Sequence, residues 1–188
     1  MSGPVDFPRG AIALSRDCPA VLIPGGEVIT LEVGTEVIIT QALGGSVTVN
    51  AAGNLLRIQG RDLDALGMSP VILPAEQAEA AADGSVDLDL VWAQLRTCYD
   101  PEIPIDVVEL GLIYRCDVRK LPDGRNQVWI EMTLTAPGCG MGPILIDDVQ
   151  RKVLQVPNVD EVDVELVFEP FWTPDMMSEA ARLQTGLY

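Results

Sequence analysis

The sequence predicts an α+β protein, in which a small all-β domain precedes a mixed domain with the element order α-β-β-α-β. Three observations support this prediction. Short β-branched runs separated by glycine fill residues 20–58, an alanine- and acid-rich segment follows, and the second half mixes helical and strand periodicity. We therefore place an all-β domain at 11–73, a linker at 74–86 and the mixed domain with its C-terminal tail at 87–188.

Five runs in the first half have the composition of strands. Each is rich in β-branched or other aliphatic residues, and glycine stands between each run and the next. The runs are 20–24, 27–31, 35–43, 46–50 and 54–58. Strands at such close spacing predict a small antiparallel barrel or sandwich. Cys18 precedes the first run, and its charged neighbours Arg16 and Asp17 favour an exposed thiol.

Apolar spacing predicts two amphipathic helices in the second half. The first has its apolar face at Leu88, Val91, Trp92, Leu95 and Cys98, and the second at Leu145, Val149, Val153 and Val156. Pro143 suits the first turn of the second helix. A cysteine on an apolar face acts as a small hydrophobe, so we expect Cys98 to be buried.

Period-two alternation predicts three strands around these helices. Residues 112–120 alternate with Cys116 on the apolar side, and the turn 121–126 joins them to 127–134 as a hairpin. Residues 161–168 alternate as a third strand. In the tail that follows, Pro174 can open a short helix and Gly186 can close it.

The charge balance excludes several classes of partner. With 28 acidic and 12 basic residues the formal charge is −16, which repels nucleic acid and anionic membrane surfaces. No segment has the length of a signal sequence core or a membrane span, so we expect a cytoplasmic protein. The four cysteines form no CxxC pair, and reduced thiols are expected. The chain contains no histidine, which disfavours histidine-assisted cysteine hydrolases and imidazole-ligated metal sites.

Cys139 lies in a turn rich in glycine and proline, just before the second predicted helix. The first turn of a helix has unpaired N–H groups and a partial positive charge, which stabilise a thiolate. A thiolate binds soft metals or attacks electrophiles. The carboxylates of Asp147 and Asp148 oppose this effect. From these residues alone, a reactive thiolate and a half-buried packing cysteine remain alternatives.

Two further stretches carry polar or aromatic residues in unusual positions. The first places Asp100, Glu102, Asp106 and Glu109 in a proline-stiffened loop, and the second is the tail around Trp172. Taken alone, the first is typical of a solvated connection between helix and strand. The second is typical of a C-terminal helix that docks an aromatic residue on the core.

Together these stretches resemble a known family. The runs "DPEIPIDVVELGLIY", "TLTAPGCGMGP" and "VPNVDEVDVELVFEP", followed by "WTPDMMSEAARLQTGL", resemble the iron–sulfur cluster assembly domain of cytosolic cluster-targeting factors and PaaD-type proteins. The amino-terminal runs "RDCPAVLIPGGEVITLEVGTEVIITQALGGSVTV" and "NLLRIQGRDLDALG" narrow the resemblance to the bacterial SufT-like branch. The similarity extends from about Arg16 to Leu187.

The resemblance implies an accessory factor of the SUF system rather than an enzyme, which assists the assembly or transfer of clusters to client proteins. Its motif cysteine corresponds to Cys139 and its threonine to Thr135. The remaining motif positions correspond to Asp100, Pro101, Glu102, Leu110, Gly111, Tyr114, Trp172, Met176, Ser178 and Glu179. Phe171 departs from the family pattern, where a second proline is expected before the tryptophan.

The implied cofactor is a transient iron–sulfur cluster held by Cys139, and no other cofactor is implied. One thiolate cannot complete the ligand set of a cluster, so a second subunit, a small thiol or a client must supply the rest. Sharing favours a homodimer, with cluster scaffolds or clients as further partners. Two alternatives remain: a metal-free adaptor that docks clients, and a thiol-redox protein, which would lack a nearby resolving cysteine.

Overall fold

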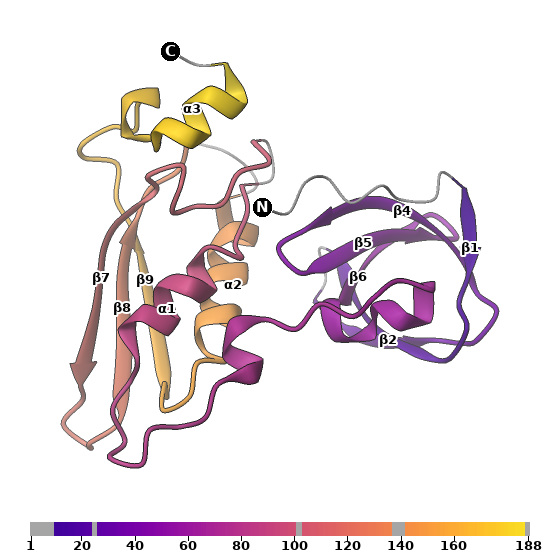
Figure 1. Ribbon diagram of the computed structural model, residues 1–188, viewed down its shortest axis with the longest axis horizontal. Helices are drawn as coiled ribbons and strands as arrows, with labels where there is room; N and C mark the ends of the chain where they lie inside the picture. Colours follow the sequence, from indigo (N-terminus) through magenta and orange to yellow (C-terminus); the bar gives the residue numbers. More distant parts are fainter. Residues whose placement is uncertain (1–9, 24–25, 101–102, 137–141, 187–188) are drawn as a thin grey trace. The chain divides into compact units, whose positions relative to one another are not determined.

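The computed structural model describes residues 10–23, 26–100, 103–136 and 142–186. The chain forms two compact units, Met1–Leu73 and Pro74–Tyr188 (Figure 1). The described part of the first unit contains a β-sheet and a short 3₁₀ helix, whereas the second unit contains both helices and strands. In the described residues, no helix has both the length and the apolar character needed to cross a bilayer.

The first unit is built on one six-stranded antiparallel sheet with the order β1-β4-β5-β6-β2-β3. Its strands are β1 (Ala11–Ala13), β2 (Cys18–Ile23), β3 (Val28–Leu31), β4 (Glu36–Leu43), β5 (Ser46–Ala51) and β6 (Asn54–Gln59). Gly44 and Gly45 join β4 to β5 with φ angles of +61° and +72°, which a two-residue hairpin turn of type I′ requires. The 3₁₀ helix η1 (Gly60–Leu66) follows β6.

The inward face of this sheet packs around completely buried aliphatic side chains, among them Val37, Val49 and Ile58. Cys18 belongs to the same cluster and has no exposed surface, so the prediction of an exposed thiol is wrong. The reason is the alternation of β2, which turns Cys18 inward opposite Leu31. Its neighbour Arg16 instead forms ion pairs with the carboxylates of η1.

The second unit contains a three-stranded sheet with the order β7-β8-β9. Its elements are α1 (Leu88–Leu95), β7 (Ile113–Lys120), β8 (Asn126–Met132), α2 (Gly142–Val153), β9 (Glu161–Leu166) and α3 (Glu179–Thr185). Strands β7 and β8 form an antiparallel hairpin, and β9 pairs with β8 in parallel. The crossover from β8 to β9 runs through α2, as parallel neighbours require. Helices α1 and α2 pack on the sheet (Figure 1).

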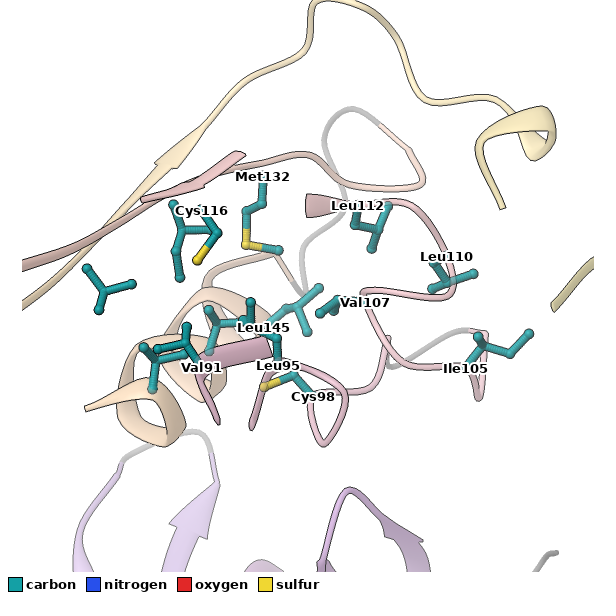
Figure 2. Packing of buried hydrophobic residues seen from close by; sticks show 14 of the residues in the cluster. Val91, Leu95, Cys98, Ile105, Val107, Leu110, Leu112, Cys116, Met132 and Leu145 are labelled. Carbon is teal, nitrogen blue, oxygen red and sulfur yellow. The ribbon is translucent and has the colours of Figure 1, made fainter. Parts of the chain in front are cut away.

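One hydrophobic cluster joins these helices to the sheet. Figure 2 shows Val91 and Leu95 of α1, Leu145 of α2, and Cys116 and Met132 of the hairpin pointing toward a common centre. Most of these side chains have no accessible surface. Cys98 follows α1 and also lies in the cluster, as its helical spacing predicts.

Residues 74–86, expected to be a linker, are part of the second unit and contact its later elements. Ala75 of the 3₁₀ helix η2 (Pro74–Gln77) is buried in the cluster, and its N–H donates to Gln94 Oε1 at 3.2 Å. Asn158 Nδ2 donates to the carbonyls of Ala81 and Ser85 at 3.1 Å and 2.8 Å. These contacts attach the segment to elements far along the chain.

Candidate functional site: a loop after the first helix held under a C-terminal strap

The site loop, residues 99–112, connects α1 to β7. Tyr99 forms an isolated bridge with Asp106, and the Asp100 N–H donates to the Ile105 carbonyl at 3.1 Å. The loop therefore returns on itself before β7 begins. Of the residues predicted in it, Glu102 and Pro101 lie outside the described residues.

The described aspartates of the site loop bind its own backbone. Asp100 is 3% exposed, and its Oδ1 accepts from the Ile103 N–H at 2.9 Å. Asp106 Oδ1 accepts from the N–H groups of Val108 and Glu109, both at 3.0 Å. Burial raises the pKa of Asp106, while the two backbone donors act against that shift. These carboxylates shape the loop, in contrast to the solvated connection that their composition alone suggests.

The C-terminal strap, residues 167–186, lies against the site loop. The Trp172 indole N–H donates to the Leu110 carbonyl at 2.7 Å, and the Ser178 N–H donates to the Glu109 carbonyl at 2.8 Å. The Ser178 hydroxyl also donates to the Glu109 carboxylate. Trp172 and Ser178 of the strap thus bind two consecutive residues of the site loop, Leu110 and Glu109.

Tyr114, at the start of β7, extends the contact. Its hydroxyl donates to the Pro170 carbonyl at 2.8 Å and contacts Met176 Sδ at 3.5 Å. Three residues predicted as interaction or supporting residues, Tyr114, Trp172 and Met176, therefore take part in one arrangement that fastens the strap. The sequence did not indicate which groups these three side chains would contact.

Gly111 permits the strap to pass closely. Its φ is +69°, and a Cβ at this position would lie 2.2 Å from the Met176 carbonyl oxygen. Glycine is therefore required here by both backbone conformation and space. Beyond it the strap enters the core, where Met177 and Ala181 are 3% and 2% exposed. Glu179, in the first turn of α3, is exposed.

Cys139 lies outside the described residues, three positions before the first residue of α2. Thr135, four residues before Cys139 in the sequence, is half-buried just beyond the end of β8. Thr133 was not singled out from the sequence, although its hydroxyl is buried and, in the part of the chain that the structure describes, has no hydrogen-bond partner. Gly142 begins α2 against Leu134, whose Cδ1 would be 2.7 Å from an added Cβ.

The other three cysteines are unsuited to ligate a metal in this fold. Burial raises the pKa of Cys18 to about 11 and that of Cys98 and Cys116 to about 12. All three are therefore protonated at neutral pH, whereas the thiolate is the ligand form. Within the described ranges, no three His, Cys, Asp or Glu side chains gather in a way that could hold a metal ion.

One buried charged residue next to the site loop was not predicted from the sequence. Lys152 is buried in α2, where its Nζ donates to the Thr97 carbonyl at 2.5 Å and pairs with Asp148 at 2.9 Å. This links the end of α1, where the site loop begins, to α2. The signal was present, because Lys152 lies seven residues after Leu145 and so falls on the apolar face of the helix.

Comparison with known proteins places these features in a family. A family model described as an iron-sulfur cluster assembly protein matches residues 88–165. The chain is 52% identical over 92 residues to the Fe-S protein maturation auxiliary factor of Porphyromonas gingivalis, covering 49% of this chain and 84% of the relative. This chain belongs to the SufT-like family of iron–sulfur cluster assembly accessory proteins.

Two more relatives carry the same description. The Fe-S protein maturation auxiliary factor SufT of Staphylococcus aureus is 41% identical over 88 residues, which are 47% of this chain and 96% of the relative. The factor YitW of Bacillus subtilis is 37% identical over 97 residues, which are 52% of this chain and 91% of the relative. The SufT-like family match includes the site loop and Cys139, whereas the first unit lies outside the residues that the family model matches.

Proposed function

We propose that this SufT-like protein assists the maturation of iron–sulfur proteins by receiving and handing on a cluster through the Cys139 thiolate. The observation that carries the proposal is family membership: two relatives described as Fe-S protein maturation auxiliary factors match 84% and 96% of their own length to about half of this chain. The family model matches residues 88–165, which include Cys139. The cluster is cargo, and the role is that of an accessory factor rather than an enzyme.

The remaining cysteines support the choice of Cys139. Cys18, Cys98 and Cys116 are buried with raised pKa values, so a thiolate at neutral pH is expected only from the fourth cysteine. A single thiolate leaves coordination positions of a cluster to other ligands. Incomplete ligation favours transfer to a client or scaffold over storage, and a homodimer would supply a second thiolate.

The strap and site loop are proposed to present the surface that clients or scaffolds contact. Trp172, Met176 and Tyr114 would act indirectly, because their polar groups bind the chain itself. Glu179, which is exposed, and Glu102 are the proposed direct contacts, and Thr135 is proposed to lie next to the cluster. Asp100 is proposed to support the loop, since its carboxylate accepts from the Ile103 N–H.

Anaerobic reconstitution with iron and sulfide tests the cargo. Wild-type protein should develop visible charge-transfer bands, and Cys139→Ser should not, because a serine hydroxyl is a harder ligand that stays protonated near neutral pH. Cys18→Ala, which removes a thiol from the first unit, is the matched control and should retain the bands. Bands of equal intensity in Cys139→Ser would exclude this cysteine as the ligand.

Activity in cells separates a cluster carrier from a metal-free adaptor. Cys139→Ser should lower the activity of cluster-dependent enzymes while leaving the melting temperature unchanged. Glu102→Gln should give a partial loss at unchanged stability, whereas Asp100→Asn should act through the loop. If wild-type protein stays colourless yet captures cluster-containing clients, the adaptor function would replace the carrier function. Normal enzyme activities with Cys139→Ser under high demand for clusters would exclude the thiolate mechanism.

A further inference from the structure

The sheet of the first unit ends in two edge strands, β1 and β3, and among the described residues the outer edge of β3 is open. β3 is the last strand of the sheet and, in the part of the chain that the structure describes, pairs only with β2. The Leu22 N–H donates to the Glu27 carbonyl at 2.8 Å, and hydrogen-bonded pairs recur at every second position of an antiparallel ladder. Val28 and Thr30 therefore direct their N–H and C=O groups away from β2. Pro19, which has no N–H, lies opposite Thr30, as this register requires.

The open edge of β3 is unusually apolar. Val28 is 72% exposed and Ile29 is 38% exposed. Ile29 belongs to the inward-facing row of β3, together with buried Leu31, and its exposure means that the core is uncovered where the sheet stops. Val33, two residues beyond the strand, is 61% exposed.

Edge strands in soluble proteins are usually protected by charged side chains, proline or a bulge. The sequence of β3, Val-Ile-Thr-Leu, contains none of these protections. Acidic residues stand only beside it: Glu27 precedes the strand and Glu32 follows it, and both are exposed. Neither forms an ion pair with any residue in the described ranges. The result is an apolar edge with a negative charge at each end.

We propose that β3 is a docking edge for an extended polypeptide segment that carries two basic residues with four uncharged, mainly β-branched residues between them. Paired antiparallel to β3, such a segment places its basic side chains opposite Glu32 and Glu27. The position opposite Ile29 covers the open core, and the position opposite Val28 packs on the outer face. Backbone groups of Val28 and Thr30 supply the hydrogen bonds, and the side chains supply the selectivity.

Charge argues against a second copy of this chain as the occupant. Antiparallel pairing of two β3 strands in the same alignment would place Glu27 of one copy opposite Glu32 of the other, at both ends. Like charges directly opposite each other are destabilising, and each chain already carries a formal charge of −16. A partner with basic ends removes this repulsion.

This docking edge goes beyond the proposed function and does not depend on Cys139. The family model begins at residue 88, and the Staphylococcus aureus relative matches 47% of this chain with 96% of its own length. β3 therefore lies in the first unit, and the few residues of the Staphylococcus aureus relative outside its match are too short to form such a unit. It would give this protein a partner that its shorter relatives do not bind in this way.

The test uses the full chain and the synthetic peptide acetyl-Lys-Val-Thr-Ile-Val-Lys-amide. Titration followed by backbone NMR should shift the Val28 and Thr30 amide signals and slow their hydrogen exchange by about tenfold or more at saturation. The same peptide with glutamate at both ends should bind at least about tenfold more weakly at low salt. Shifts confined to other residues, or equal binding of the two peptides, would overturn the proposal.

Thr30→Pro is the discriminating variant. Because the Thr30 N–H faces the open edge, proline removes one docking donor without breaking the ladder to β2, and edge strands tolerate proline. Binding should be lost with Thr30→Pro and retained with Thr30→Val, which keeps the N–H. Equal binding by both variants would overturn the proposal. Slow hydrogen exchange of the Val28 and Thr30 amides before peptide is added would also overturn the proposal, because it would mean that the chain or a second copy already covers β3.

Discussion

The indole N–H of Trp172 donates to the backbone carbonyl of Leu110 at 2.7 Å, across 62 positions of sequence. Leu110 is completely buried in the turn that ends the site loop, so its carbonyl depends on a partner from the protein. This bond, with the Ser178 and Tyr114 contacts, makes the position of the C-terminal strap and the shape of the site loop interdependent.

Trp172→Phe should loosen the strap while keeping an aromatic ring in place. Loss of one hydrogen bond to a buried carbonyl should cost about 1 kcal/mol and lower the melting temperature by about 3 °C. All tryptophans and tyrosines of the chain lie after residue 73, so near-ultraviolet circular dichroism reports on the second unit. Phe171→Ala is the control: Phe171 is 64% exposed, and its loss should leave melting unchanged. Equal melting of Trp172→Phe and wild type would contradict the contact.

Gly111→Ala should displace the strap more severely. The substitution combines a left-handed backbone with a Cβ 2.2 Å from the Met176 carbonyl oxygen, and should cost about 2 kcal/mol or more. Gly124 offers a matched control, since its φ is +87° but no atom lies within 4 Å of an added Cβ. Gly124→Ala should therefore cost only about 1 kcal/mol.

Limited proteolysis and chemical denaturation measure the difference between these glycine variants. Gly111→Ala should expose the strap to cleavage, while Gly124→Ala should leave it as resistant as in wild type. If the two variants lose the same free energy of unfolding, backbone conformation alone accounts for both, and the close passage of Met176 has no energetic weight.

Local patterns in the sequence were sufficient for the coarse fold. The α1 spacing predicted buried Val91 and Leu95, and the combination of an all-β and a mixed α/β region is confirmed. The strap contacts could not be predicted, because a bond from Trp172 to a backbone carbonyl leaves no trace in side-chain periodicity. Cys18 was predicted to be exposed because its neighbours are charged. That prediction was wrong, because the alternation of the six-residue strand β2 turns the Cys18 side chain inward. Lys152 was missed because a charged residue on an apolar face was not considered as a buried anchor.

Thiol reactivity should separate Cys139 from the other cysteines. Native protein treated with iodoacetamide at pH 8 should be alkylated first at Cys139, because the remaining three thiols are buried with pKa values of about 11 to 12. Peptide mass spectrometry gives the rate at each site. In denaturant the four rates should converge. Faster native labelling of Cys98 or Cys116 than of Cys139 would be incompatible with this order.

Alkaline pH should destabilise the second unit through its buried thiols. Cys98 has a folded-state pKa of about 12 against an ordinary value of 9.0, and Cys116 behaves alike. Below pH 9 both states hold the proton, so the stabilisation is fully present. Between pH 9 and 12 the unfolded chain loses the proton and the folded chain keeps it, so stability falls.

Unfolding by denaturant at pH 8 to 11, followed by tryptophan fluorescence, measures this slope. Cys98→Ala should give a shallower decline than wild type, whatever its stability at pH 8. Cys18→Ala lies in the unit without tryptophan and serves as the control, with an unchanged slope. A Cys98→Ala slope as steep as that of wild type would show that other groups carry the alkaline transition.

Residues 74–86 should belong to the folding unit that follows them. A fragment 74–188 should fold alone with a cooperative melt, because it contains its own hydrophobic cluster, including Ala75. A fragment 87–188 lacks the Gly84 carbonyl that accepts from Asn126 Nδ2 at 3.0 Å, and the two carbonyls that accept from Asn158. Asn126 is buried, so losing its Gly84 partner should cost about 1 to 3 kcal/mol.

Near-ultraviolet circular dichroism should show ordered aromatic side chains in both fragments and a lower melting temperature for the shorter one. Equal melting temperatures would mean that the segment is a linker, as its composition suggests, and a fragment 74–188 without a cooperative melt would mean that the two units fold together.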